Sequence, residues 1–230
     1  MTKASEVFGT NPRTGEPLEP VTDETTEAEV AAHRAELIEI ASAETGFGAA
    51  KLDGEINRAA FQFRFFGDVI SEGSYLEVAI DPPGDTPMGP RPELRRILHP
   101  LGPVAVFGSS NFPFAFSVLG GDTASALASG CPVILKAHPS HPATSQLSYE
   151  IIAAALADGP APQGVVAIVY GTRAGAALVA QPAVKAVGFT GSLHGGKALI
   201  DIIQHARRTD PLLRRTEQSQ PGRRHPGRRI

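Results

Sequence analysis

The chain has 230 residues, of which 42% are hydrophobic and 20% charged, and this fits one large or two small globular domains with a real core. Its single cysteine excludes an internal disulfide framework and a multi-cysteine metal site. No run approaches the roughly 18–20 apolar residues of a transmembrane helix, and the N-terminus lacks the apolar core of a signal peptide. We therefore expect a cytoplasmic protein without membrane partners.

The net charge of −3 hides an asymmetry. Residues 206–230 contain eight arginines and two acidic residues, which sum to +6, so residues 1–205 sum to −9. Such asymmetry often marks a tail that binds nucleic acid or membranes. The segment has no Phe, Tyr or Trp on which bases could stack, so a nucleic-acid partner is not favoured.

The N-terminal part predicts an extended arm followed by two helices. Residues 1–23 are polar and rich in Gly, Pro and Thr, and we expect them to be extended. Apolar residues recur at helical spacing over 26–43 and again over 54–71. Residues 74–81 alternate between polar and apolar and predict a strand, which Pro82 and Pro83 end.

After Pro92 short apolar runs alternate with helical patterns. Strands are predicted over 104–107, 133–135, 165–169 and 187–189, and helices over 114–128, 143–157, 175–180 and 196–204. Buried strands that alternate with helices indicate a parallel sheet built from βαβ units. The predicted fold class is α/β, with N-terminal helices and a parallel-sheet, Rossmann-like dinucleotide-binding domain within residues 24–205.

The junction "VFGSSNFPFAF" places Gly108, Ser109 and Asn111 directly after a strand, at the sheet edge where open α/β folds bind ligands. The amide of Asn111 is suited to face a developing oxyanion. Taken alone, the spacing favours a simpler role, in which Asn111 caps the next helix or satisfies the turn.

Two further junctions carry polar or glycine residues. In "VILKAHPSHP", Lys136 ends a strand and could meet a phosphate or sugar, although a lone lysine usually extends to the surface. His138 and His141 have no carboxylate or cysteine beside them, so no metal site is expected. In "GFTGSLHGGK", a glycine turn before a helix can approach a diphosphate closely, but alone it is weak evidence.

Together these motifs resemble one family. The segments "GPVAVFGSSNFPFAFSVLGGDTASALASGCPVILKAHPSHPATS", "YGTRAGAAL" and "VKAVGFTGSLHGGK" are similar to the N-terminal and cofactor-binding part of an aldehyde dehydrogenase, over about residues 6–205. The likeness is greatest to the branch with α-ketoglutarate semialdehyde dehydrogenase and NADP-dependent fatty aldehyde dehydrogenase.

The resemblance implies a role for each matched residue. It makes Asn111 the oxyanion amide, Lys136 the contact to the adenosine ribose, and residues 190–192 the turn under the diphosphate. Many NAD-preferring members have a glutamate where this chain has Pro139, so the resemblance favours NADP over NAD. The implied cofactor-binding residues are Gly108, Ser109, Lys136, His138, Pro139, Gly171, Arg173, Thr190, Gly191, Ser192 and Gly196.

The family oxidises aldehydes to acids with a cysteine nucleophile and a glutamate base. Neither Cys131, which precedes a strand, nor Glu217 matches these residues. We therefore expect a truncated, inactive chain of oxidoreductase ancestry, in which the family's homo-oligomer is doubtful. Two alternatives stay open: an N-terminal half that works with a separate C-terminal chain, and a nucleotide-binding module with a basic nucleic-acid-binding tail.

The basic segment 206–230 is expected to be disordered and has a possible origin in a frameshift. Codons chosen for residues 208–225 and read one base forward give Gly-Pro-Ile-Pro-Phe-Tyr-Gly-Glu-Leu-Ser-Ser-Leu-Asn-Pro-Val-Val-Val. This resembles the family's continuation, including its catalytic glutamate, which would span the codons of Arg215 and Thr216. The sequence thus predicts that the true frame is lost near Arg207.

Overall fold

The computed structural model describes residues 6–10, 17–23 and 27–209, with side chains described for residues 33–206. The helices are α1 (Glu27–Thr45), α2 (Ala49–Glu72), α3 (Gly121–Ala128), α4 (Pro142–Ala157), α5 (Thr172–Val179) and α6 (Leu193–Thr209), with a 3₁₀ turn η1 (Ser74–Leu76). The strands are β1 (Glu6–Thr10), β2 (Pro17–Asp23), β3 (Ala79–Asp81), β4 (Gly84–Thr86), β5 (Gly89–Arg91), β6 (Leu94–Arg96), β7 (Val104–Phe107), β8 (Val133–Lys136), β9 (Val166–Val169) and β10 (Ala186–Phe189).

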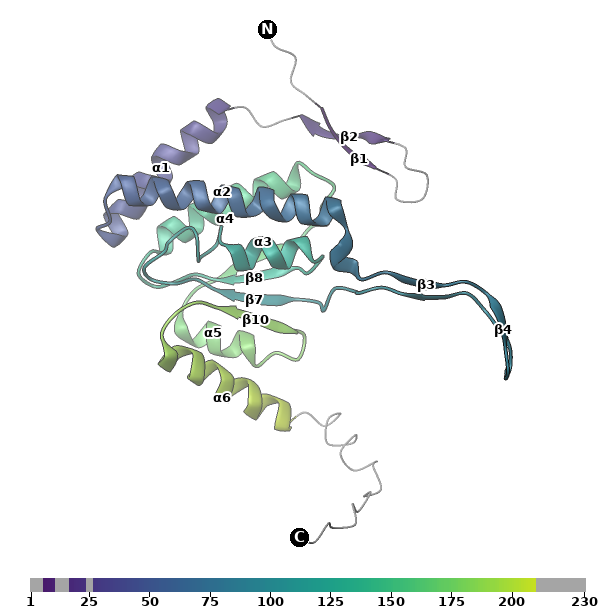
Figure 1. The fold of residues 1–230 in the computed structure, drawn as a ribbon. Coiled ribbons are helices and arrows are strands. Elements are labelled where there is room, and N and C mark those ends of the chain that lie inside the picture. Colours follow the sequence, from purple (N-terminus) through teal and green to yellow (C-terminus); the bar gives the residue numbers. More distant parts are fainter. Residues whose placement is uncertain (1–5, 11–16, 24–26, 210–230) are drawn as a thin grey trace, which may run out of the picture.

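The centre of the molecule is a four-stranded parallel sheet with the order β10-β7-β8-β9 (Figure 1). The strands are short apolar runs, and all four residues of β7 are buried. Their side chains form a core with α3, in which Val106, Val133 and Leu135 are at most 2% exposed. The predicted α/β class with a parallel sheet is confirmed.

The register of this sheet aligns the carboxyl ends of its strands. Phe189 of β10 pairs with Phe107 of β7, Phe107 pairs with Lys136 of β8, and Lys136 pairs with Val169 of β9. These four residues are the last of their strands. The loops that follow them therefore leave the sheet side by side, along one edge.

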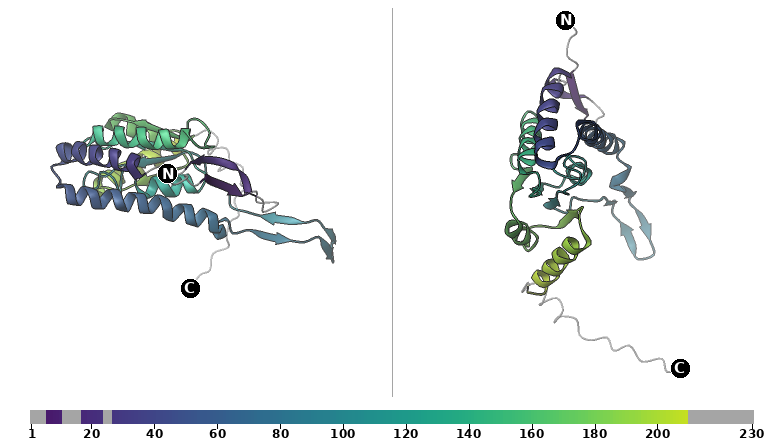
Figure 2. Two further views of the ribbon diagram at one scale, coloured as in Figure 1. Left: turned by 90° about the horizontal axis from the view of Figure 1, so that it is seen from above. Right: turned by 90° about the vertical axis from the view of Figure 1, so that its left-hand side faces the viewer.

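Helices cover both faces of the sheet (Figures 1 and 2). On one side α1, α2, α3 and α4 pack together, and on the other lie α5 and α6. A second core joins α1 and α2 to the loop after β7, with Leu52 and Phe114 fully buried. Within the part of the chain that the structure describes, no helix is long and apolar enough to cross a membrane.

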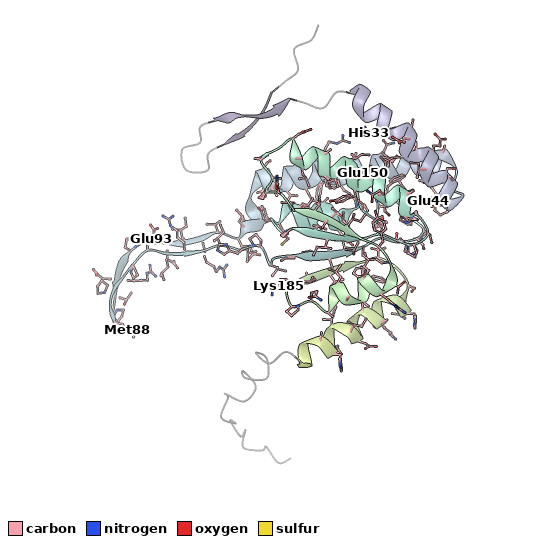
Figure 3. All side chains as sticks on the ribbon, turned by 180° about the vertical axis from the view of Figure 1, so that it is seen from behind. His33, Glu44, Met88, Glu93, Glu150 and Lys185 are labelled. Atoms are coloured by element: carbon pink, nitrogen blue, oxygen red, sulfur yellow. The ribbon has the colours of Figure 1, made fainter. Side chains whose placement is uncertain are left out.

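A two-stranded arm extends away from the sheet and was not fully predicted. β3 pairs with β6 and β4 with β5, both antiparallel, and Met88 at the tip is 99% exposed (Figures 1 and 3). The strand predicted over 74–81 is wrong in its first half. Residues 74–76 form η1, and Glu77 has a left-handed φ of 47°, so the strand begins only at Ala79.

The helix predicted over 114–128 begins seven residues late, at Gly121. Residues 114–120 form consecutive turns instead, in which Ser117 N–H donates to Phe114 O and Gly120 N–H to Ser117 O. A Cβ at Gly120 would lie 2.8 Å from Ala115 O, so this tight turn requires glycine. The apolar spacing of the segment reflects burial in turns rather than a helix.

The two ends of the chain differ from the expected boundaries. β1 and β2 pair antiparallel inside the segment expected to be an extended arm. α6 continues to Thr209, five residues beyond the predicted end and into the segment expected to be a disordered tail. Residues 210–230 lie outside the described residues.

Candidate functional site

The predicted site residues come from four loops at the carboxyl edge of the sheet. Gly108 follows β7, Lys136 ends β8, Gly171 follows β9 and Thr190 follows β10. Because the strands are parallel and in register, segments far apart in the sequence meet at this edge. It is also the edge at which open α/β sheets bind ligands.

Asn111 and the glycine turn line one cavity. The cavity has a volume of about 450 Å³ and is bordered by Ser110, Asn111, Phe112, Phe116, Thr190, Gly191 and Ser192. The loop after β7 thus faces the turn after β10. This brings together the residue suited to an oxyanion and the turn suited to a diphosphate.

The turn after β10 has no room for a larger residue. A Cβ on Gly191 would lie 2.7 Å from the Phe189 ring. Ser192 Oγ accepts a hydrogen bond of 3.1 Å from Gly195 N–H in the first turn of α6. Gly196, also expected at the cofactor, lies near the start of α6 and borders a larger and more apolar cavity of about 1370 Å³ between β10, α5 and α6.

Asn111 does not cap a helix. α3 begins at Gly121 with Gly120 as its N-cap residue, so the capping role that the spacing favoured is wrong. The Asn111 side chain is exposed at the cavity, whereas its carbonyl oxygen accepts a hydrogen bond of 2.9 Å from Lys51 Nζ. The amide is therefore available to a ligand.

Ser109 lies deeper in the same loop and is 2% exposed. Its N–H donates to Phe116 O at 2.9 Å, and its carbonyl oxygen lies 2.8 Å from His141 Nε2. His141 is fully buried, with Nδ1 3.2 Å from Ser145 Oγ. His141 therefore joins this loop to the start of α4.

Lys136 is buried rather than extended to the surface, with 9% of it exposed. Its stem packs under α5, where a Cβ on Gly175 would lie 3.3 Å from both Lys136 Cγ and Cε. Burial lowers the pKa of the Lys136 ammonium below its usual value. An anion at this position would favour the charged form.

His138 is half-buried beside Lys136. Its ring stacks on His141 with centroids 5.5 Å apart, and its Nδ1 accepts a hydrogen bond of 3.1 Å from Ser140 N–H. Burial lowers the pKa of His138, and the charges of His141 and Lys136 lower it further. All of these effects disfavour the charged form of the imidazole.

The remaining predicted residues are exposed along the same edge. Pro139 and Arg173 lie at the surface, after β8 and in the first turn of α5. Gly171 has φ +90° and is the N-cap residue of α5, so a side chain there would be strained. A phosphate group has access to all three positions.

Cys131 lies at the opposite end of the sheet. It precedes β8, is 3% exposed and packs in the core beside Val133. Cys131 is therefore a small side chain of the core. Among the described residues, no three His, Cys, Asp or Glu side chains are grouped to hold a metal ion.

A parallel sheet with helices on both faces, and with its loops gathered along the carboxyl edge of the strands, defines an open α/β protein. Residues 24–213 match the model of the aldehyde dehydrogenase family. The chain belongs to this family, as the sequence motifs predicted.

The curated relatives include two enzymes of one kind. The chain is 54% identical over 170 residues to alpha-ketoglutaric semialdehyde dehydrogenase 2 of Azospirillum brasilense, covering 72% of this chain and 32% of that protein. It is 43% identical over 179 residues to the alpha-ketoglutaric semialdehyde dehydrogenase of Acinetobacter baylyi, covering 77% and 34%. The chain thus spans about a third of the length of these relatives.

Solved structures agree with the family. An NAD-dependent benzaldehyde dehydrogenase of Corynebacterium glutamicum aligns with a TM-score of 0.62 and 26% identity, over 76% of this chain and 36% of that one. Betaine aldehyde dehydrogenase of Staphylococcus aureus, solved with NAD⁺, has 20% identity and a TM-score of 0.61 over 78% of this chain and 34% of that one. Glyceraldehyde-3-phosphate dehydrogenase of Methanocaldococcus jannaschii, solved with NADP, has 20% identity and a TM-score of 0.60 over 76% of this chain and 37% of that one. Both dinucleotides therefore occur on this fold.

Proposed function

We propose that this chain is the dinucleotide-binding part of an NAD(P)-dependent aldehyde dehydrogenase. The observation that carries the proposal is the cavity in which Asn111 faces the glycine turn 190–192 at the carboxyl edge of the sheet. The turn leads into α6, whose N-terminal N–H groups favour an anion. Gly191 has no side chain to cover its backbone, which permits a close approach to a diphosphate.

The residues along the edge divide the cofactor between them. In this proposal Thr190, Gly191 and Ser192 hold the diphosphate, Lys136 holds the adenosine ribose, and Gly171 lies beside the adenine. Gly108 and Ser109 form the floor of the loop, and Gly196 belongs to the helix below the diphosphate. When bound there, the oxidised dinucleotide would supply the hydride acceptor for the oxidation of an aldehyde.

NADP is the favoured dinucleotide. Pro139 carries no charge that would repel a 2′-phosphate. Lys136 ends β8, His138 lies in the loop that follows it, and Arg173 lies in the first turn of α5. A phosphate would offset the burial that lowers the pKa values of Lys136 and His138. NAD lacks this phosphate, so these residues would stabilise bound NAD less than bound NADP.

Asn111 is the residue of this chain that would act on the substrate. Its exposed amide N–H would donate to the oxyanion that forms when a nucleophile adds to the aldehyde carbonyl, an interaction stronger in the transition state than in the ground state. The sequence identity to two alpha-ketoglutaric semialdehyde dehydrogenases supports alpha-ketoglutaric semialdehyde, a small aldehyde acid, as the ancestral substrate.

We further propose that the 230 residues do not oxidise aldehydes by themselves. Their one cysteine, Cys131, is buried before the amino end of β8, at the end of the sheet opposite Asn111. A frameshift near Arg207 would account for the absence of the family's general-base glutamate, because the shifted reading frame encodes a glutamate. Helices α5 and α6 lie on the same face of the sheet, and βαβ crossovers are right-handed. A strand after α6 would therefore pair with the edge of β10 that has no partner among the described residues, and it would end at the edge of the sheet where Asn111 lies.

The test compares this chain with the product of the gene corrected by one base. Each would be incubated with NADP and alpha-ketoglutaric semialdehyde, and NADPH formation followed by absorbance. We expect no turnover by the 230-residue chain and turnover by the corrected one. Aldehyde-dependent NADPH formation by the 230-residue chain alone would contradict the proposal, and resequencing the codons after 200 would decide whether the shifted frame exists.

A second candidate function is that of one half of a two-chain enzyme. The apolar cavity of about 1370 Å³ beside β10 favours it, because a partner strand and its apolar residues could fill that space. An adjacent open frame that encodes the missing cysteine would support this candidate. Turnover that appears only when both chains are mixed would distinguish it from a restored single chain.

A further inference from the structure

A buried carboxylate on α2 contacts the loop that carries Asn111. Glu55 Oε2 accepts a hydrogen bond of 3.3 Å from Phe114 N–H, and Glu55 Oε1 accepts one of 2.5 Å from Lys51 Nζ. Glu55 is only 4% exposed, which is rare for a carboxylate unless it is paired. Two charge-assisted contacts stabilise this carboxylate in the protein interior.

Lys51 extends the contact to Asn111 itself. Its ammonium donates to the Asn111 carbonyl oxygen at 2.9 Å, across 60 residues of sequence. The same nitrogen lies 3.6 Å from the centroid of the Phe47 ring and 5.0 Å from that of Phe112. Two aromatic faces and two oxygen acceptors thus hold the ammonium in one position.

The two side chains act as a unit. Without Lys51, Glu55 would be a buried charge with only the Phe114 N–H as its partner, and such uncompensated charges are strongly unfavourable. The loop would then lose its contact at Asn111 and be displaced at Phe114 as the carboxylate gained water. On the other side of the loop, the contact of His141 with Ser109 would remain.

We propose that Lys51 and Glu55 are positioning residues that fix the backbone on both sides of the Asn111 amide and so direct it into the cavity shared with residues 190–192. Neither residue touches the reacting atoms. The inference rests on the proposed function of Asn111, but the contacts that carry it belong to this chain alone.

The test is backbone hydrogen exchange of residues 109–116 in the full 230-residue chain. Lys51→Met keeps the apolar stem and removes the charge, and we expect exchange there to rise about tenfold or more, as for the loss of a charge-assisted hydrogen bond. Amides of β8 and β9 should exchange as before. Arg64→Met, which removes an exposed cation from the same helix, should change neither.

A positioning role also predicts a specific rescue and a specific signature. Lys51→Arg should restore most of the protection, and the side-chain NH₂ signals of Asn111 in NMR spectra should shift in Lys51→Met but not in Arg64→Met. If Lys51→Met does not fold, the same measurements on Glu55→Gln replace it, since this variant has nearly the same shape. Unchanged exchange at 109–116, or an equal rise throughout the sheet, would overturn the inference.

A titration with NADP separates this inference from the proposed function. We expect Lys51→Met to lower the affinity of the chain for NADP much less than Lys136→Met does, because Lys51 contacts the Asn111 loop and not the residues proposed to hold the ribose. Failure of the unsubstituted chain to bind NADP would contradict the proposed function. It would leave the exchange result at residues 109–116 as the test of the positioning role.

Discussion

Lys136 carries the charge that the proposed cofactor site depends on. We predict that Lys136→Met lowers the affinity for NADP about tenfold or more, since a charged contact to the ribose or its phosphate is lost. The melting temperature should change little, because methionine fills much of the space under Gly175. Isothermal titration measures the affinity, with Lys185→Met, an exposed lysine at the other end of the sheet, as the control. Equal losses in both variants would contradict the assignment.

The carboxyl group of Asp122 should make the stability of the fold depend on pH. Burial under β10 raises the pKa of its carboxyl group, whose atoms lie 3.1–3.2 Å from where a Cβ on Gly188 would be. A raised pKa in the folded state means that ionisation destabilises the fold. The neutral carboxyl group of Asp122 contributes stability that is fully present below its pKa in the unfolded chain. That contribution is lost as pH rises through its pKa in the folded chain.

Asp122→Asn should therefore raise the melting temperature at neutral pH by roughly 1–4 °C, the effect of up to about 1 kcal/mol in a chain of this size. The gain should vanish in acid, below the ordinary carboxyl pKa, where Asp122 is neutral as well. Asp68→Asn, at an exposed position on α2, should have no such effect at either pH. A gain that persists in acid would show that burial of charge is not its cause.

The residues that line the site could be predicted from the sequence, but the contacts of Lys51 and Glu55 that hold the Asn111 loop could not. Asn111, Lys136 and the turn 190–192 stand directly after apolar runs, so their meeting at one edge follows from strand polarity. Lys51 and Glu55 look like an ordinary surface pair four residues apart on a helix. Nothing in the sequence indicates that they reach a loop some 60 residues further on.

Among the elements, the packing of α5 on the sheet depends on a glycine. A Cβ on Gly175 would lie 3.1 Å from Phe107 Cε1 and 3.3 Å from Lys136, so Gly175→Ala should lower the free energy of unfolding by about 1–3 kcal/mol. Gly54 in α2 has open space around it, and Gly54→Ala should instead raise that free energy by about 0.5–1 kcal/mol. Urea unfolding measures both; destabilisation of similar size by both substitutions would contradict the packing argument.

The predictability of each element follows from what its residues bury. The four strands of the sheet were placed to within a residue or so because they are continuous apolar runs between turns. β4, β5 and β6 were missed because "GDT", "GPR" and "LRR" lack apolar alternation and pair in an arm that is mostly exposed. The late start of α3 was missed because buried turns imitate helical spacing.

At the scale of the whole molecule, the charge asymmetry makes a prediction about nucleic acid. Residues 210–230 contain six arginines and two acidic residues, so their removal lowers the net charge of the chain by four. We expect the shortened chain to keep the melting temperature and the NADP affinity of the full chain, and to lose only weak, salt-dependent binding to DNA. Tight binding of one nucleic-acid sequence, lost with this segment, would favour the alternative of a nucleic-acid-binding module.

We propose that NADP binds at the carboxyl edge of this sheet. The most direct measurement is a calorimetric titration of the 230-residue chain with NADP and, under the same conditions, with NAD. We expect saturable binding of NADP at one site per chain, weaker binding of NAD, and an affinity for NADP about tenfold or more lower in Lys136→Met. A folded chain that binds neither dinucleotide would contradict it.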